Sequence, residues 1–215
     1  MLNKVNNKSL LPGEKVSPKA TDEGIKYNMK LIADLGNPGD KYRGTRHNAG
    51  YIAIDAVAEK AGVKIDRAAH KGLTGRGALG GHGVLFLKPE TYMNSSGESV
   101  REAAAFYKIP PERILVFCDD ISFEPGRVRI RRSGSHGGHN GLRNITEQLG
   151  SEAFPRIRIG VGQKPHPEYD LVDWVLGKLS PEDLKKITDK ADDLFQAATL
   201  VVSGDVETAM NRYSH

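Results

Sequence analysis

Residues 30–62 read KLIADLGNPGDKYRGTRHNAGYIAIDAVAEKAG, and this stretch decides the fold class. A short apolar run at 30–35 ends in a turn that contains glycine and proline. Apolar residues then recur at helical spacing from Tyr51 to Ala61, until Gly62 stops the pattern. A strand, a tight turn and a helix in this order are typical of α/β proteins.

The rest of the chain repeats this alternation of strand and helix patterns. Strands are predicted at 84–87, 114–117, 127–132 and 156–161. Helices are predicted from a capping box at Ser95 and Glu98 to about Tyr107, at 142–149, from the Ser180-Pro181 cap to about Val202 as one long helix, and after a cap at Asp205. We therefore expect a three-layer sandwich in which helices flank a mixed, mostly parallel central sheet.

The chain of 215 residues fits one domain preceded by a short extension. Residues 1–28 show neither helical nor strand periodicity, and we expect a disordered tail or an upstream-start extension there. Residues 29–215 are expected to form a single catalytic domain. The tail has neither the apolar region of a signal peptide nor the arginines of a transit peptide, which favours a cytoplasmic protein.

Composition excludes several classes of protein. The chain has no apolar run near the ~18 residues that a membrane span needs. Its single cysteine, Cys118, excludes an intramolecular disulfide and a multi-cysteine zinc site. The net charge of +4 is compatible with a polyanionic partner without requiring one.

Some familiar patterns carry no chemistry here. The GxGxxG match at 75–80 leads into a predicted strand, whereas a dinucleotide fingerprint opens a helix. His136 and His139 could bind a metal, but the glycine-rich loop around them offers no third ligand, so we expect incidental loop histidines and no metal. Cys118 is expected to be a packed thiol.

The loops after the predicted strands hold a possible acid–base pair. In α/β sheets, sites form at the carboxyl ends of strands. His47 could act as a general base there, with Asp119 or Asp120 orienting its imidazole. Three amides in the same loops, Asn37, Asn94 and Asn140, could donate hydrogen bonds to a developing oxyanion or to a substrate.

Four stretches of the sequence resemble the motifs of one known family. They are LGNPGDKYRGTRHNAG (35–50), KPETYMNSSG (88–97), DDISFEPGRVRIRRSGSHGGHNGLRNI (119–145) and FPRIRIGVG (154–162). In this order they resemble the motifs of the bacterial peptidyl-tRNA hydrolase family. The resemblance implies a monomeric, cofactor-free esterase of the cytoplasm that releases tRNA from peptidyl-tRNA during translation, with no membrane and no obligate protein partner.

The resemblance also implies a role for individual residues. His47 matches the family's catalytic base, Asp119 its orienter, and Asn37 the position that distinguishes peptidyl from free aminoacyl groups. Further matches fall on substrate-binding positions: Asn94 and Asn140 as amides, Tyr42 and Tyr92 as aromatic residues near the tRNA end, and Arg131 and Arg158 as a clamp on the tRNA 5′-phosphate. Guanidinium groups on half-exposed strands suit that last role, because they bind phosphate bidentately.

Two departures and two alternative functions stay open at this point. Asp34 stands where the family has a small residue, and Cys118 stands where many members have histidine. A non-catalytic RNA-binding protein of the splicing type could share this fold, because a fold does not fix a function. A small-molecule esterase could share the histidine–aspartate pair, although the arginines favour a nucleic-acid substrate.

Overall fold

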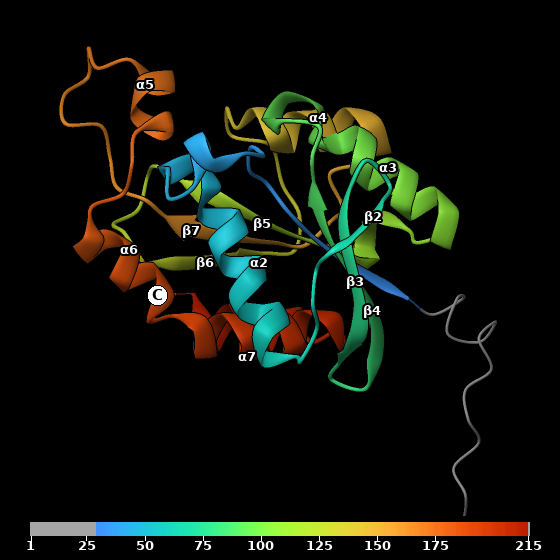
Figure 1. Cartoon of the computed structure of the whole chain (residues 1–215). Helices are drawn as coiled ribbons and strands as arrows, with labels where there is room; N and C mark the ends of the chain where they lie inside the picture. Colours follow the sequence, from blue (N-terminus) through green and yellow to red (C-terminus); the bar gives the residue numbers. More distant parts are fainter. Residues whose placement is uncertain (1–28, 215) are drawn as a thin grey trace, which may run out of the picture.

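A computed structural model describes residues 29–214. The extension expected at 1–28 lies outside the described residues, as does His215. The part that is described forms one sandwich around a seven-stranded sheet (Figure 1).

The sheet is mixed, as the sequence predicts, and its parallel pairings lie at the centre. Its strands are β1 (Lys30–Asp34), β2 (Arg67–Ala69), β3 (Gly72–Leu79), β4 (His82–Pro89), β5 (Ile114–Asp120), β6 (Val128–Arg131) and β7 (Arg156–Gly160), in the order β2-β3-β4-β1-β5-β7-β6. Three of the six pairings are parallel, β4 with β1, β1 with β5 and β5 with β7. Every residue of β5 is buried, as expected of a central strand that is covered on both faces.

Helices cover both faces of this sheet. The α-helices are α2 (Ala49–Lys60), α3 (Ser96–Tyr107), α4 (Asn140–Leu149), α5 (Leu171–Leu176), α6 (Pro181–Thr188), α7 (Ala191–Val202) and α8 (Val206–Tyr213). Short 3-10 turns precede several of them: η1 (Asp40–Tyr42), η2 (Arg46–Asn48), η3 (Met93–Ser95) and η4 (Pro111–Arg113).

Two apolar clusters make the three layers. One joins the sheet to α2, α7 and α8, and the other joins it to α3 and α4 (Figure 1). Helix α2 lies very close to the sheet, because a Cβ on Gly50 would lie 2.6 Å from the carbonyl oxygen of Leu35. This contact fixes the start of α2, and with it the η2 turn, against the carboxyl end of β1.

Two expectations about helices were wrong. The helix expected from Pro181 to Val202 is two helices, α6 and α7, separated by a turn at Asp189 and Lys190. Both α6 and α7 pack on α2. Asp192 and Asp193 in the first turn of α7 also suit a helix start.

The capping box at Ser95 and Glu98 does not form either. Ser95 occupies the N-cap of α3, but its side chain accepts no capping bond, because the preceding η3 turn gives it a nearly helical ψ of 11°. The side chain of Asn144, on α4, caps α3 instead by accepting from the Gly97 N–H at 2.8 Å. Glu98 pairs with Lys71 at 2.7 Å.

The caps at Ser180 and Asp205 are confirmed, since their side chains accept from the backbone N–H of Asp183 and Thr208. Strands β2 and β3 and helix α5 were not anticipated. The GxGxxG match falls in β3 and the turn after it and opens no helix. Among residues 29–214, no helix combines the length and apolar character that crossing a membrane requires.

Candidate active site

A pocket of about 450 Å³ lies where the loops after β1, β4 and β5 meet the start of α4. Eight of the nine predicted site residues line it: Asn37, Tyr42, His47, Tyr92, Asn94, Asp119, Asn140 and Arg158. The ninth, Arg131, does not. Residues from four separate motifs therefore form one cavity.

His47 and Asp119 are in direct contact at the base of this pocket. The Nδ1 of His47 lies 2.9 Å from Oδ1 of Asp119. If Nδ1 carries the proton and donates to the carboxylate, Nε2 is left as a free base. Burial disfavours a charged imidazole, but the charge of Asp119 and its hydrogen bond outweigh burial, so the pKa of His47 lies above its ordinary value.

His139 also contacts Asp119, and the expectation of an incidental loop histidine was wrong. Its Nε2 lies 2.9 Å from the same oxygen, Oδ1 of Asp119. Its Nδ1 accepts from the N–H of Leu142 as the N-cap of α4, which leaves Nε2 as the donor. A signal was present in the sequence, because His139 directly precedes the start of α4, but histidine is an uncommon cap.

The two imidazoles decide the electrostatics of Asp119. Burial alone would raise the pKa of this carboxyl, yet the two histidines hold it well below its ordinary range. The three polar side-chain atoms lie within 4.8 Å of one another, a spacing that could also suit a metal ion. Two hydrogen bonds to one carboxylate oxygen account for this convergence without one.

Asp120, the competing orienter, has different partners. Its Oδ1 accepts from the N–H of Ser122 at 2.9 Å, and its Oδ2 lies 2.9 Å from Nε of Arg158. Asp120 therefore holds Arg158 at the rim of the pocket, while Asp119 faces the histidines.

Asn37 is fixed by neighbours that the sequence analysis did not single out. Its backbone N–H donates to the side chain of Asn48, and its backbone carbonyl accepts from the same amide, both at 2.9 Å. Its side-chain Oδ1 accepts from the Met93 N–H at 2.8 Å. The remaining Nδ2 group is then the part of Asn37 that is free to donate to a bound molecule.

The other predicted groups lie around the rim. The rings of Tyr42 and Tyr92 meet edge to face with centroids 6.4 Å apart, and 56% of Tyr92 is exposed. Asn94 and Asn140 are both exposed and both line the pocket. Such exposed aromatic and amide groups can contact a base and a peptide bond.

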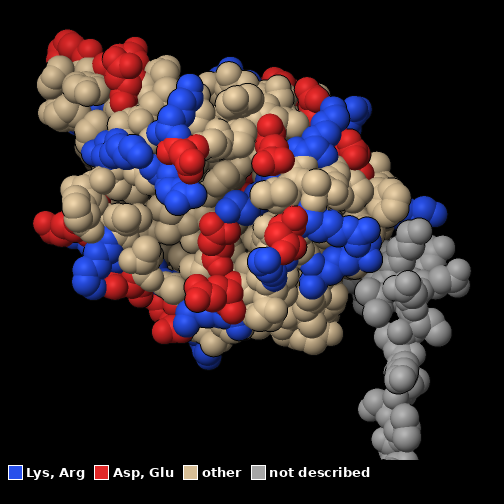
Figure 2. All heavy atoms as spheres, viewed as in Figure 1, with Lys and Arg blue, Asp and Glu red and all other residues tan. Residues whose placement is uncertain are grey.

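Arg131 lies outside the pocket but on the same face of the sheet as Arg158. In the antiparallel pairing of β6 and β7, Arg129 is opposite Arg158 and Arg131 is opposite Arg156. Arg131 and Arg158 are therefore diagonal neighbours, a spacing of roughly 7–8 Å in sheets. Figure 2 shows basic and acidic side chains intermixed on one face of the molecule. The register of β6 and β7 brings these two arginines together.

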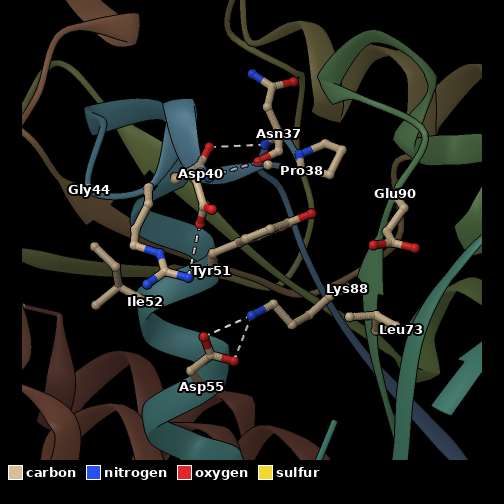
Figure 3. A pocket seen from close by; sticks show the side chains of 13 residues that line it. Asn37, Pro38, Asp40, Gly44, Tyr51, Ile52, Asp55, Leu73, Lys88 and Glu90 are labelled. Carbon is tan, nitrogen blue, oxygen red and sulfur yellow. Dashed lines mark hydrogen bonds and ion pairs between the residues drawn. The ribbon is translucent and has the colours of Figure 1, made fainter. Parts of the chain in front are cut away.

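Both departures from the family pattern are buried. Asp34 is fully buried, and within residues 29–214 its two carboxylate oxygens have no hydrogen-bond partner. Burial and the nearby Asp34 both raise the pKa of the Tyr51 hydroxyl. Lys88 pairs with Asp55 at 2.7 Å rather than with Asp34 (Figure 3). Cys118 is buried as expected, and burial raises the pKa of its thiol to about 12.

The fold and the site together define an α/β protein with a histidine–aspartate pair in an open, amide-lined pocket. The sequence model of the peptidyl-tRNA hydrolase family matches residues 31–215. The chain therefore belongs to the peptidyl-tRNA hydrolase family.

Similar proteins agree with this assignment. The peptidyl-tRNA hydrolase of Clostridium acetobutylicum is 50% identical over 186 residues, which cover 86% of this chain and 98% of that protein. That of Lachnospira eligens is 46% identical, and the match covers 86% of this chain and all of that protein. The crystal structure of the Acinetobacter baumannii enzyme superposes with a TM-score of 0.81 at 40% identity, over 87% of this chain and 95% of that one.

Proposed function

We propose that this chain hydrolyses the ester bond between a peptide and the ribose of tRNA, and so releases free tRNA and peptide. The observation that carries the proposal is the contact of His47 with Asp119 in a pocket that also contains Asn37, Asn94 and Asn140. Family membership supports the same reaction.

His47 is the general base in this proposal. Its Nε2 takes a proton from water as the water attacks the ester carbonyl, and the Asp119 carboxylate stabilises the imidazolium that forms. The resulting imidazolium can return the proton to the ribose oxygen that leaves. His139 shares the Asp119 oxygen and fixes the carboxylate from the second side.

The asparagines bind the substrate. Asn37 Nδ2 can donate to a carbonyl of a blocked amino acid, because its Oδ1 is already occupied by the Met93 N–H. A free ammonium group offers no acceptor at that place. Asn94 and Asn140 can donate to the oxyanion or to the next peptide group.

The tRNA part of the substrate is assigned to the rim and to the arginine face of β6 and β7. Tyr42 and Tyr92 can stack against the terminal bases, since exposed aromatic rings bind unpaired bases without regard to sequence. Arg131 and Arg158 can bind the 5′-phosphate from one face of the sheet. We further propose that the protein acts as a cytoplasmic monomer without cofactor or metal.

One assay tests the function. The protein is incubated with an N-acetylated aminoacyl-tRNA and, separately, with the unblocked aminoacyl-tRNA, and released tRNA is separated from charged tRNA on an acid gel. We expect rapid release only from the blocked substrate. Binding of tRNA without release would favour the RNA-binding alternative, and equal hydrolysis of a simple amino-acid ester would favour a general esterase.

A further inference from the structure

Helix α5 stands away from the body of the sandwich, at the upper left of Figure 1, and yet forms one wall of the catalytic pocket. Four of its apolar side chains line that pocket: Leu171, Val172, Val175 and Leu176. Three of these side chains are exposed, at 43%, 58% and 36% for Leu171, Val172 and Leu176. A helix of six residues is not stable by itself, so other parts of the chain must hold α5 in place.

The side chain of Arg46, which lies in the η2 turn together with His47, holds α5 in place. Its guanidinium carbon lies 3.5 Å from the centroid of the Trp174 ring, in the middle of α5. Its Nη1 donates to the carbonyl oxygen of Lys178 at 3.1 Å, just after α5. The far edge of the indole donates through Nε1 to the carbonyl oxygen of Gly162 at 3.0 Å. Trp174 is thus held between Arg46 and the loop after β7.

The backbone joins the same two segments. The N–H of Arg46 donates to the Gly177 carbonyl at 3.0 Å, and the N–H of Leu179 donates to the Gly44 carbonyl at 2.9 Å. These bonds do not depend on the Arg46 side chain. A substitution at Arg46 should therefore loosen the helix without unfolding the protein.

We propose that Arg46 is a positioning residue that sets which acyl groups the enzyme accepts. The guanidinium of Arg46 packs on the Trp174 ring and holds α5 against the turn that carries His47. The apolar side chains of α5 that line the pocket then bind a large apolar side chain of the amino acid esterified to tRNA. Arg46 itself touches α5 rather than the pocket, so it acts through the helix. The proposal rests on the proposed hydrolysis of peptidyl-tRNA.

Kinetics with two substrates test this role. Arg46→Met keeps the length of the side chain but loses the charge and the bonds to carbonyl oxygens. We expect the KM for N-acetyl-leucyl-tRNA to rise by about fivefold, the effect of one lost cation–π contact, and the KM for N-acetyl-glycyl-tRNA to change by less than about twofold. The kcat and the acidic limb of the pH profile should stay in place for both. Arg46→Lys should recover part of the loss.

The matched control is Arg43→Met, which removes an exposed arginine side chain, three positions earlier, that pairs with Asp40 in a surface ion pair. It should leave both KM values unchanged. An equal rise of KM on both substrates with Arg46→Met would overturn the selective role. A loss of kcat with a displaced acidic limb would also overturn it, because Arg46 would then act on His47.

A second measurement does not depend on activity. Hydrogen–deuterium exchange of the amides of residues 171–179 should be faster in Arg46→Met than in wild type and unchanged in Arg43→Met. Unchanged exchange in Arg46→Met would overturn the proposal even if the enzyme hydrolyses peptidyl-tRNA. Conversely, if wild type released no tRNA, the proposed function would fail while the exchange experiment would still report on the contact between Arg46 and α5.

Discussion

The carboxyl ends of β1 and β5 lie side by side, and each strand buries an aspartate near its end. Asp34 is 0% exposed and Asp119 is 2% exposed. Burial raises the pKa of Asp34 well above its ordinary value, with only a partial opposing effect from Lys88, whereas two imidazoles reverse the effect of burial for Asp119. Similar burial therefore accompanies pKa shifts in opposite directions, and the charged partners of each carboxyl decide the direction.

The difference between the two pKa shifts follows from where each carboxyl lies along the sheet. Asp119 faces the η2 turn and the start of α4, and each of these supplies a histidine. Asp34 lies beside Phe117 in the parallel pairing of β1 and β5, two residues before Asp119 and so further from the carboxyl end of the sheet. The end of β1 contributes to the pocket through Asn37 instead.

The largest effect should come from removing the reactive partner of Asp119. His47→Ala should lower kcat by roughly 10² to 10⁴, the usual contribution of general-base catalysis, with the thermal midpoint nearly unchanged. His82→Ala, at the turn between β3 and β4, is the matched control and should keep full activity. Wild-type turnover in a folded His47→Ala protein would exclude His47 as the base.

Asp119→Asn removes the charge and keeps the shape. Because the carboxylate raises the pKa of His47, the acidic limb of the pH–rate profile should move to lower pH, and the maximal rate should fall by part of the ~10² to 10⁴ factor of general-base catalysis. Asp120→Asn should leave the limb in place, since Asp120 pairs with Arg158. A limb that moved with Asp120→Asn instead would exchange the two roles.

The arginines should affect binding rather than chemistry. Arg131→Ala and Arg158→Ala should each flatten the slope of log K against log salt by about one unit and raise the KM for full-length substrate, with little change in kcat. Arg67→Ala, on the opposite edge strand β2, is the matched control. A minimal substrate that carries only the acylated 3′ end should not distinguish these variants, and equal losses on both substrates would indicate a purely structural role.

Asn37→Ala tests what the end of β1 contributes. Loss of one hydrogen bond to the blocked amino acid should lower the ratio of peptidyl to aminoacyl hydrolysis by about fivefold, which corresponds to ~1 kcal/mol. The ratio is measured with N-acetylated and free aminoacyl-tRNA of the same amino acid. An unchanged ratio would move the role to Asn94 or Asn140.

Asp34→Ala should have the smallest effect on activity and should stabilise the fold. Removing a buried carboxyl whose oxygens have no hydrogen-bond partner among residues 29–214 should raise the free energy of unfolding by about 1 to 3 kcal/mol. The pKa of Asp34 is raised in the folded state, so the carboxyl destabilises the fold increasingly as the pH rises above the ordinary pKa of an aspartate. The stability gained by Asp34→Ala should therefore be larger at pH 8 than at pH 4. Urea unfolding at both values measures it.

Asp34→Asn is the control for this prediction. It cannot ionise, so it should remove the pH dependence while it keeps most of the cost of burying a polar group. A stability that is lower in Asp34→Ala than in wild type at pH 8 would mean that Asp34 has a partner after all.

The sequence by itself determined the order along the chain of the central strands and of most helices, and it indicated eight of the residues that line the pocket. Apolar periodicity is a local property, so 114–117 and 156–161 are recognisable without neighbours, and the loops after parallel strands must converge. The motifs then placed His47, Asp119 and Asn37 at one site, where the structure shows them.

Only the tertiary structure decided which groups touch. His139 reaches Asp119 across 20 residues, and Asn48 holds the backbone of Asn37 across 11, distances over which no local pattern acts. Three further features likewise depend on packing against other elements: the turn between α6 and α7, the strands β2 and β3, and the contact of the Arg46 guanidinium with the Trp174 ring. The pKa values of Asp34 and Asp119 shift in opposite directions for the same reason. The sequence shows where a carboxylate stands, but only the fold supplies its partners.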